Sequence, residues 1–269
     1  MHSVFNGLKT QLRDLLPKRY QVPAKYWYGR LSGALEEEMK FLPLLVGQGD
    51  RVIDIGGNRG VYAYRLWGLK ATVEVFEPNP LCFHVLETWA AGKPEVRLHS
   101  VALSSQSGSA NLHIPIDESG VEHDASASIE QSGFTNARDQ LVSLQTLDSY
   151  QFDNVALIKI DVEGHEYSVI EGAVGTIAAS RPALLIEIEQ RHCGRPIDEV
   201  FQKIIGLGYD GFFLENHKLK ALGDFNLCSH QAMESFGGQA GGYINNFLFL
   251  HRDRLANGDY AGFLRANSF

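Results

Sequence analysis

Residues 51–60 read R-V-I-D-I-G-G-N-R-G, and this stretch decides the fold. Its first five residues are a short apolar run typical of a buried strand, and residues 61–69 after it are helical in pattern. Glycines between a strand and a helix let the backbone turn sharply and approach a ligand, to which the start of the helix offers free N–H groups. The stretch therefore predicts a strand, a ligand-binding turn and a helix.

The alternation of strands and helices continues on both sides of this stretch. We expect strands over residues 72–76, 95–99, 155–160, 183–188, 209–214 and 246–250, and helices over residues 35–45, 81–91, 167–179 and 197–207. Strands that alternate with helices of about ten residues indicate βαβ units and a parallel sheet. Residues 104–146 differ, because they contain a polar, Ser- and Gly-rich segment beside two alternating segments. They predict a hairpin and loop inserted into an otherwise continuous α/β domain.

The first 34 residues predict a basic helical extension before this domain, which spans residues 35–269. Residues 1–30 carry six basic side chains and one acidic one, so the rest of the chain holds a net charge of −13. Apolar residues at positions 5, 8, 12, 15 and 16 recur at helical spacing, and we expect Pro17 and Pro23 to end that pattern. We favour a helix that packs on its own domain, and keep open peripheral contact with an anionic membrane or a partner protein.

Composition excludes several classes of protein. The net charge of −8 argues against a sequence-independent nucleic-acid binder, which needs a basic surface. Three scattered cysteines are too few for a disulfide framework or a thiolate zinc site, so we expect a reducing, cytoplasmic location. No apolar run approaches the ~20 residues that span a bilayer, and the first residues lack the apolar core of a secretory signal.

An acidic residue at the end of the second strand narrows the ligand class. Glu77 follows Gly60 by 17 residues, where doubly wound sheets place an acid that binds ribose hydroxyls. The dinucleotide fingerprint G-x-G-x-x-G is incomplete, because Ile55 stands at its first glycine. Asp54 before the turn repels phosphate but suits a cationic ligand. We therefore favour S-adenosylmethionine and keep a nicotinamide cofactor as the alternative.

A second acidic cluster, K-I-D-V-E-G-H-E at residues 159–166, follows the most apolar strand. Ligands of open α/β sheets bind at the carboxyl ends of the strands, so we expect Asp161 to face the site. Asp161 and His165 are candidate general bases. Glu163 and Glu166 have a plainer interpretation, as acids in the first turn of a helix.

Two more glutamates close the next strand. Alternation along the strand would place Glu187 and Glu189 on the same face. Asp161, Glu187 and His192 together form a less favoured candidate for a divalent metal site. No spacing in the sequence enforces such a site, so we expect no metal.

Beyond these features, the chain resembles the FkbM family of S-adenosylmethionine-dependent methyltransferases over about residues 35–250. The resemblance rests on V-I-D-I-G-G-N-R-G-V-Y (52–62), V-F-E-P-N-P (75–80), V-A-L-S (101–104), L-Q-T-L-D (144–148), I-K-I-D-V-E-G-H-E (158–166), P-A-L-L-I-E-I (182–188) and N-F-L-F (246–249). It implies a class I methyltransferase fold, a Rossmann-like three-layer α/β sandwich. The sheet of that fold has seven strands and is mostly parallel, with an antiparallel last strand.

The resemblance also assigns roles to residues. The cofactor would contact the first glycine turn, bind its ribose at Glu77, lie with its adenine beside Val101 and Ala102, and have its methionine end near Asp161. The predicted cofactor-binding residues are Asp54, Gly56, Gly57, Asn58, Gly60, Tyr62, Glu77, Pro78, Asn79, Val101, Ala102 and Asp161.

The implied reaction is O-methylation of a hydroxyl on a small-molecule or glycan acceptor, which would be a sugar, a glycolipid or a secondary metabolite. We expect Asp161 or His165 to accept the hydroxyl proton and Glu187 to orient the substrate. Two other interpretations stay open. One is a nicotinamide-dependent oxidoreductase, and the other is a non-catalytic module that binds S-adenosylmethionine.

Overall fold

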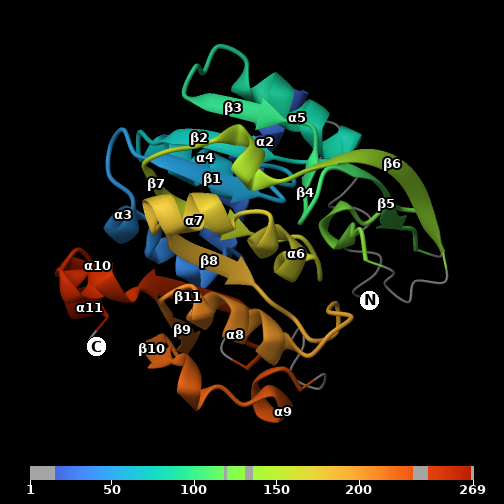
Figure 1. The fold of residues 1–269 in the computed structure, drawn as a ribbon. Helices are drawn as coiled ribbons and strands as arrows, with labels where there is room; N and C mark the ends of the chain where they lie inside the picture. Colours follow the sequence, from blue (N-terminus) through green and yellow to red (C-terminus); the bar gives the residue numbers. More distant parts are fainter. Residues whose placement is uncertain (1–15, 118–119, 131–135, 233–241, 268–269) are drawn as a thin grey trace.

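A central eight-stranded sheet organises the protein (Figure 1). The computed structural model describes residues 16–117, 120–130, 136–232 and 242–267. The strands of the sheet lie in the order β10-β9-β11-β8-β7-β1-β2-β3. Their bounds are β1 (Arg51–Ile55), β2 (Thr72–Phe76), β3 (Val96–His99), β7 (Val155–Ile160), β8 (Ala183–Glu187), β9 (Tyr209–Glu215), β10 (Lys218–Ala221) and β11 (Asn246–His251).

The direction of the strands confirms the predicted fold class. β3, β2, β1, β7 and β8 pair in parallel, and β11 is antiparallel to both β8 and β9. One difference is the eighth strand, because β10 pairs antiparallel with β9 at the edge of the sheet. Asn216 and His217 connect the two strands with φ values of 50° and 65°, as a tight hairpin turn requires. This turn contains no glycine, so the sequence carried no strong hairpin signal.

Helices cover both faces of the sheet and complete the three layers. On one face, α4 (Val61–Gly68) and α5 (Pro80–Ala90) pack over Val52, Val73 and Val75, and α2 (Lys18–Ser32) packs against both helices. On the other face, α6 (Glu166–Glu171), α7 (Val174–Ser180) and α8 (Ile197–Gly206) share a core with Ile53 and Ile158. Neighbouring residues of β1 thus enter opposite cores, as side chains of a strand must.

The segment between β3 and β7 forms a second, smaller sheet. Its strands are β4 (Ala102–Leu103), β5 (Gly108–Pro115) and β6 (Ala137–Gln145), in the order β4-β6-β5. β5 and β6 are antiparallel, and Leu112, Ile114 and Val142 form a small core with Ala102. Figure 1 shows this sheet beyond the carboxyl ends of β1 and β7, where it can cover a ligand site.

Two predicted helices are interrupted. Residues 35–45 form a 3₁₀ helix (Glu37–Lys40) followed by the one-turn α3 (Leu42–Leu45), instead of one helix. Pro43 has no N–H to continue a preceding helix, so a new turn starts there. Residues 167–179 divide into α6 and α7 around Gly172, which lies directly against the backbone of Ser104. Contact with the second sheet therefore overrides helical propensity at this point.

The amino-terminal prediction needs a correction at Pro23. Helix α2 begins after Pro17 and continues through Pro23, although proline removes one helical hydrogen bond. Val22 and Tyr26 of this helix are buried in the domain core, and this burial offsets the lost hydrogen bond. The predicted helix at positions 5–16 lies almost entirely outside the described residues.

None of the described helices combines the length and the apolar character that crossing a membrane requires. The described residues also include three short helices, which are α9 (Leu227–His230), α10 (Arg252–Ala256) and α11 (Ala261–Ala266).

Substitution of Gly172 tests the contact between the two sheets. A Cβ atom at Gly172 would lie 2.0 Å from the carbonyl oxygen of Ser104, a backbone atom that cannot rotate away. We expect Gly172→Ala to lower the free energy of unfolding by about 1–3 kcal/mol. The matched control is Gly68→Ala at the end of α4, where the added methyl meets no atom within 4 Å. Urea denaturation measures both, and equal stability of the two variants would contradict the close contact.

Candidate active site

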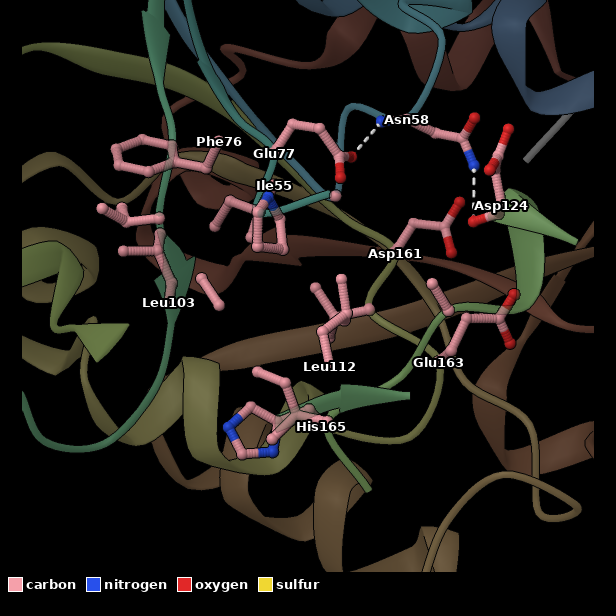
Figure 2. A pocket seen from close by; sticks show the side chains of 17 residues that line it. Ile55, Asn58, Phe76, Glu77, Leu103, Leu112, Asp124, Asp161, Glu163 and His165 are labelled. Atoms are coloured by element: carbon pink, nitrogen blue, oxygen red, sulfur yellow. Dashed lines mark hydrogen bonds between the residues drawn. The ribbon is translucent and has the colours of Figure 1, made fainter. Parts of the chain in front are cut away.

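A pocket of about 590 Å³, counted up to its open mouth, lies at the carboxyl ends of β1, β2 and β7 (Figure 2). It gathers residues from six separate segments of the chain. Those predicted to bind the cofactor are Gly56, Asn58, Glu77, Pro78, Val101, Ala102 and Asp161. The second sheet and the loop that follows β5 close the pocket with Leu112, Asp124, Ala127 and Ile129.

The glycine turn allows β1 and β7 to meet at this pocket. Gly56 has φ 78°, and a Cβ atom there would lie 1.8 Å from the carbonyl oxygen of Asp161. Only glycine tolerates both the conformation and the approach. Gly57 and Gly60 complete the turn, and α4 begins directly after Gly60. The predicted interpretation of this stretch as a strand, a turn and a helix agrees with the structure.

Glu77 is buried at the centre of the pocket wall. Its carboxylate accepts hydrogen bonds from the backbone N–H groups of Asn58 at 2.6 Å and Asn79 at 2.7 Å. Burial raises the pKa of Glu77 to about 7, although these two hydrogen bonds favour the ionised form. The side chain points into the pocket, where it can accept further hydrogen bonds (Figure 2).

A salt bridge holds the loop after β5 over the glycine turn. Arg59 donates from Nε to the carboxylate of Asp124 at 3.0 Å, and both side chains are about nine-tenths buried. The amide of Asn58 also donates to the backbone carbonyl of Asp124 at 3.4 Å. The turn that carries the predicted cofactor residues is therefore joined directly to the inserted segment. Sequence reasoning missed this pair, because 65 residues separate its members.

A second lobe of about 1140 Å³, again counted to its open mouth, adjoins the first. Gly56, Asn58, Asp161 and Glu163 line both lobes. The second lobe also contains Asp54 and Tyr62, two residues predicted to bind the cofactor, and Glu187, predicted to orient the substrate. The two lobes therefore form one continuous site, with Asp161 and Glu163 at the junction.

Lys159 is a buried cation in the second lobe. Its Nζ lies 3.9 Å from Asp161, 4.0 Å from Glu187 and 3.3 Å from the side-chain oxygen of Asn246. Burial alone would lower the pKa of Lys159, but nearby carboxylates raise it above its ordinary value. These carboxylates belong to Asp161, Glu36, Glu187 and Asp54.

The acidic groups of the lobe have raised pKa values. Burial raises the pKa of Asp54 to about 7, and its Oδ2 has no hydrogen-bond partner among the described residues. Asp161 and Glu187 both lie beside Lys159, close enough for their charges to interact. Burial raises the pKa of both, and the charge of Asp161 raises that of Glu187 further. This lobe therefore favours a cationic ligand, which would stabilise the ionised carboxylates.

His165, the other predicted base, lines the first lobe but is held on both sides. Its Nδ1 lies 2.6 Å from Glu130 and its Nε2 lies 2.9 Å from the hydroxyl of Ser104. Ser104 precedes β5 and Glu130 follows it, so His165 joins this segment to α6. The structure thus brings His165 into the pocket without a free ring nitrogen.

Several site residues were not among those predicted. Glu36 accepts a hydrogen bond from the hydroxyl of Tyr62 at 2.5 Å, yet in the sequence it belongs to an ordinary acidic run. Glu163 precedes α6 instead of lying in its first turn, whereas Glu166 does start that helix and accepts a hydrogen bond from the N–H of Gly164.

No set of three His, Cys, Asp or Glu side chains within the described ranges could hold a metal ion.

Lys159 provides a test of the acidic lobe. We expect Lys159→Met to lower the free energy of unfolding by about 3–5 kcal/mol, since Asp161 and Glu187 lose their buried cation. The loss should be larger at about pH 8 than at about pH 5, because protonation removes the unpaired charge. Urea denaturation at both pH values measures it. The control is Lys203→Met, whose partly exposed pair with Glu171 is worth less than about 1 kcal/mol. A loss that does not depend on pH would contradict the electrostatic role of Lys159.

Comparison with known proteins identifies the family of the chain. The sequence profile of the methyltransferase FkbM domain matches residues 54–210, more than half of the chain. The hexuronic acid methyltransferase AglP of Haloferax volcanii is 31% identical over 145 residues, which are 53% of this chain and 58% of that protein. Among solved structures, a methyltransferase FkbM from Methylobacillus flagellatus superposes with a TM-score of 0.50 at 15% identity. This superposition covers 89% of the present chain and 57% of that one. The chain therefore belongs to the FkbM family of S-adenosylmethionine-dependent methyltransferases.

Proposed function

We propose that this chain transfers the methyl group of S-adenosylmethionine to a hydroxyl of a sugar-containing acceptor. The observation that carries the proposal is the two-lobed acidic site, in which Asp161 stands between the lobes. The first lobe has a buried carboxylate and apolar walls suited to a nucleoside. The second has the carboxylates that an ammonium and a sulfonium require. A nicotinamide cofactor carries neither an ammonium nor a sulfonium group. The family to which the chain belongs also favours methyl transfer.

The described residues fit the cofactor. Glu77 would bind the ribose hydroxyls, and Val101 and Ala102 would lie beside the adenine. The buried Oδ2 of Asp54, which has no partner among the described residues, suits the ammonium of the methionine part. When bound, S-adenosylmethionine supplies a methyl group already activated on a sulfonium sulfur. The protein then has to align the acceptor, exclude water and receive one proton.

The electrostatics of the second lobe favour a neutral acceptor group. The name of the Haloferax relative indicates a hexuronic acid, a sugar with both hydroxyls and a carboxylate. Around the junction of the lobes stand Asp161, Glu163 and Glu187, and ionised carboxylates there would repel an anionic nucleophile. A hydroxyl carries no charge before it reacts. We therefore infer a hydroxyl of a sugar, glycolipid or glycosylated metabolite as the methylated group.

Incubation of the full chain with S-adenosylmethionine and a panel of glycans tests the function. The panel pairs each uronic acid with the neutral sugar of the same configuration, and mass spectrometry detects the added methyl group. Methylation of a hydroxyl on either member supports the proposal. Methylation confined to the carboxylate would overturn the acceptor group. Cofactor binding without transfer to any member would instead indicate a non-catalytic module.

Glu77 provides a test of cofactor binding. We expect Glu77→Gln to weaken S-adenosylmethionine binding about tenfold to a hundredfold, because charge-assisted hydrogen bonds to the ribose are lost. Isothermal titration calorimetry measures the dissociation constant. The matched control is Glu87→Gln on the exposed side of α5, whose carboxylate is 65% exposed and far from the pocket. Equal affinity of wild type and Glu77→Gln would exclude Glu77 from the ribose site.

A further inference from the structure

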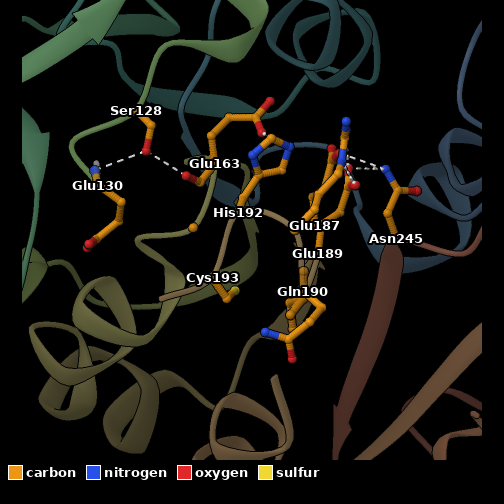
Figure 3. Close-up of polar contacts among 12 residues, drawn as sticks. Ser128, Glu130, Glu163, Glu187, Glu189, Gln190, His192, Cys193 and Asn245 are labelled. Carbon is orange, nitrogen blue, oxygen red and sulfur yellow. Dashed lines mark hydrogen bonds and ion pairs between the residues drawn. The ribbon is translucent and has the colours of Figure 1, made fainter. Parts of the chain in front are cut away.

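Glu163 and His192 form a pair at the junction of the two lobes (Figure 3). Glu163 belongs to the loop between β7 and α6, and His192 to the loop between β8 and α8. The Oε2 of Glu163 lies 3.1 Å from the Nε2 of His192, within ion-pair distance, although the geometry of this contact is not that of a hydrogen bond. The two side chains are 16% and 11% exposed, so both are largely withdrawn from water, and Glu163 lines both lobes. Neither residue was predicted to be catalytic.

Three segments of the chain hold this pair in place. Glu163 has φ 53°, a left-handed conformation that costs free energy in a residue with a side chain. The hydroxyl of Ser128, in the segment between β5 and β6, donates to the backbone carbonyl of Glu163 at 2.6 Å. Gly164 has φ 102°, and a Cβ atom there would lie 2.2 Å from the carbonyl oxygen of His192. The loop carrying His192 therefore approaches Glu163 only because residue 164 is glycine. Backbone strain of this kind is concentrated at functional sites.

The other candidate bases are already engaged. Asp161 lies 3.9 Å from the ammonium of Lys159, which favours its ionised form, and its charge interacts with that of Glu187. Both ring nitrogens of His165 have partners. Glu163, by contrast, lines both lobes. Its carboxylate contacts the imidazole of His192, a group that is either neutral or cationic. Its carboxylate thus lies at the junction of the two lobes.

We propose that Glu163 is the general base of the methyl transfer and that His192 is its positioning residue. The inference rests on the proposed function, since it assigns the proton of an acceptor hydroxyl. As the acceptor oxygen forms a bond to the methyl carbon, the bond between that carbon and sulfur breaks and its electron pair stays on sulfur. The O–H proton moves to the carboxylate of Glu163. The products are the methyl ether, the neutral thioether and a protonated Glu163.

The surroundings of Glu163 set the pH at which it can act. The charged and titratable groups that face it are Asp161, Glu166, Glu189, Arg191 and His192. Burial, together with the charges of Asp161, Glu189 and Glu166, raises the pKa of Glu163 to about 8, and Arg191 opposes this shift. Burial lowers the pKa of His192, and Arg191 lowers it too. A base must be unprotonated, so the rate should fall as the pH decreases below about 8.

Isosteric substitution tests the base. We expect Glu163→Gln to lower kcat at least a hundredfold, the scale of general-base catalysis, with the dissociation constant of S-adenosylmethionine changed less than about threefold. The loss of rate below about pH 8 should disappear in the residual activity. His192→Asn should lower kcat about tenfold and move that pH dependence without removing it. The control is Glu171→Gln, a partly exposed carboxylate on α6 outside both lobes, which should keep wild-type kinetics.

A second measurement needs no acceptor. Nuclear magnetic resonance of the protein with ¹³Cε1-labelled histidine gives the His192 signal, assigned by its absence from His192→Asn. In wild type this signal should shift as Glu163 titrates, and in Glu163→Gln that shift should be absent. If Glu163→Gln is unstable, Glu163→Asp keeps the carboxylate and the titration in a residue that tolerates a positive φ.

The outcomes separate this inference from the function on which it rests. If wild type methylates an acceptor and Glu163→Gln is within threefold of it, Glu163 is not the base but the proposed function stands. If His192 titrates identically in wild type and Glu163→Gln, the pair does not share its protons and the inference fails. If wild type binds S-adenosylmethionine but methylates no hydroxyl in the panel, the proposed function and the inference fail together.

Discussion

The site depends on the close approach of β1 and β7 at their carboxyl ends. Gly56 lies against the backbone of Asp161, with no room for a side chain between them. This approach brings the glycine turn, and with it the backbone N–H that binds Glu77, next to the acidic loop that follows β7. It also places Asp161 and Glu163 in the walls of both lobes. The two lobes are thereby adjacent and share part of their walls.

Carboxylates accumulate in and around the two lobes at a cost in stability. Asp54, Glu77, Glu163 and Glu166 are largely buried, and burial raises the pKa of each to about 7 or 8. Lys159, which lines the second lobe, offsets part of this negative charge. The remaining excess of acid is what a cationic ligand would balance. An arrangement of this kind stores free energy that binding can release, because the ligand supplies the missing positive charge.

The second sheet and the segment between its two long strands do more than cover the first lobe. Asp124 is joined to the glycine turn through Arg59, Glu130 to α6 through His165, and Ser128 to the loop after β7. These contacts connect one inserted segment to the glycine turn, to the start of α6 and to the loop after β7. Movement of the segment would therefore change the walls of the first lobe and the position of the Glu163 backbone together.

The sequence by itself determined the strands of the main sheet and the ends at which ligands bind. β1, β2 and β7 have the predicted bounds, because a parallel strand buried on both faces must be almost continuously apolar. Asp54, the glycine turn, Glu77 and Asp161 could be placed because they directly follow or close those strands. Local signals failed where distant contacts decide, as at Gly172, where the second sheet interrupts a helix, and at the β9–β10 turn. Only the tertiary structure brought Glu36 to Tyr62, Asp124 to Arg59 and His192 to Glu163. The partners in these pairs lie on separate segments, most of them loops, and loops carry no periodicity from which their meeting could be predicted.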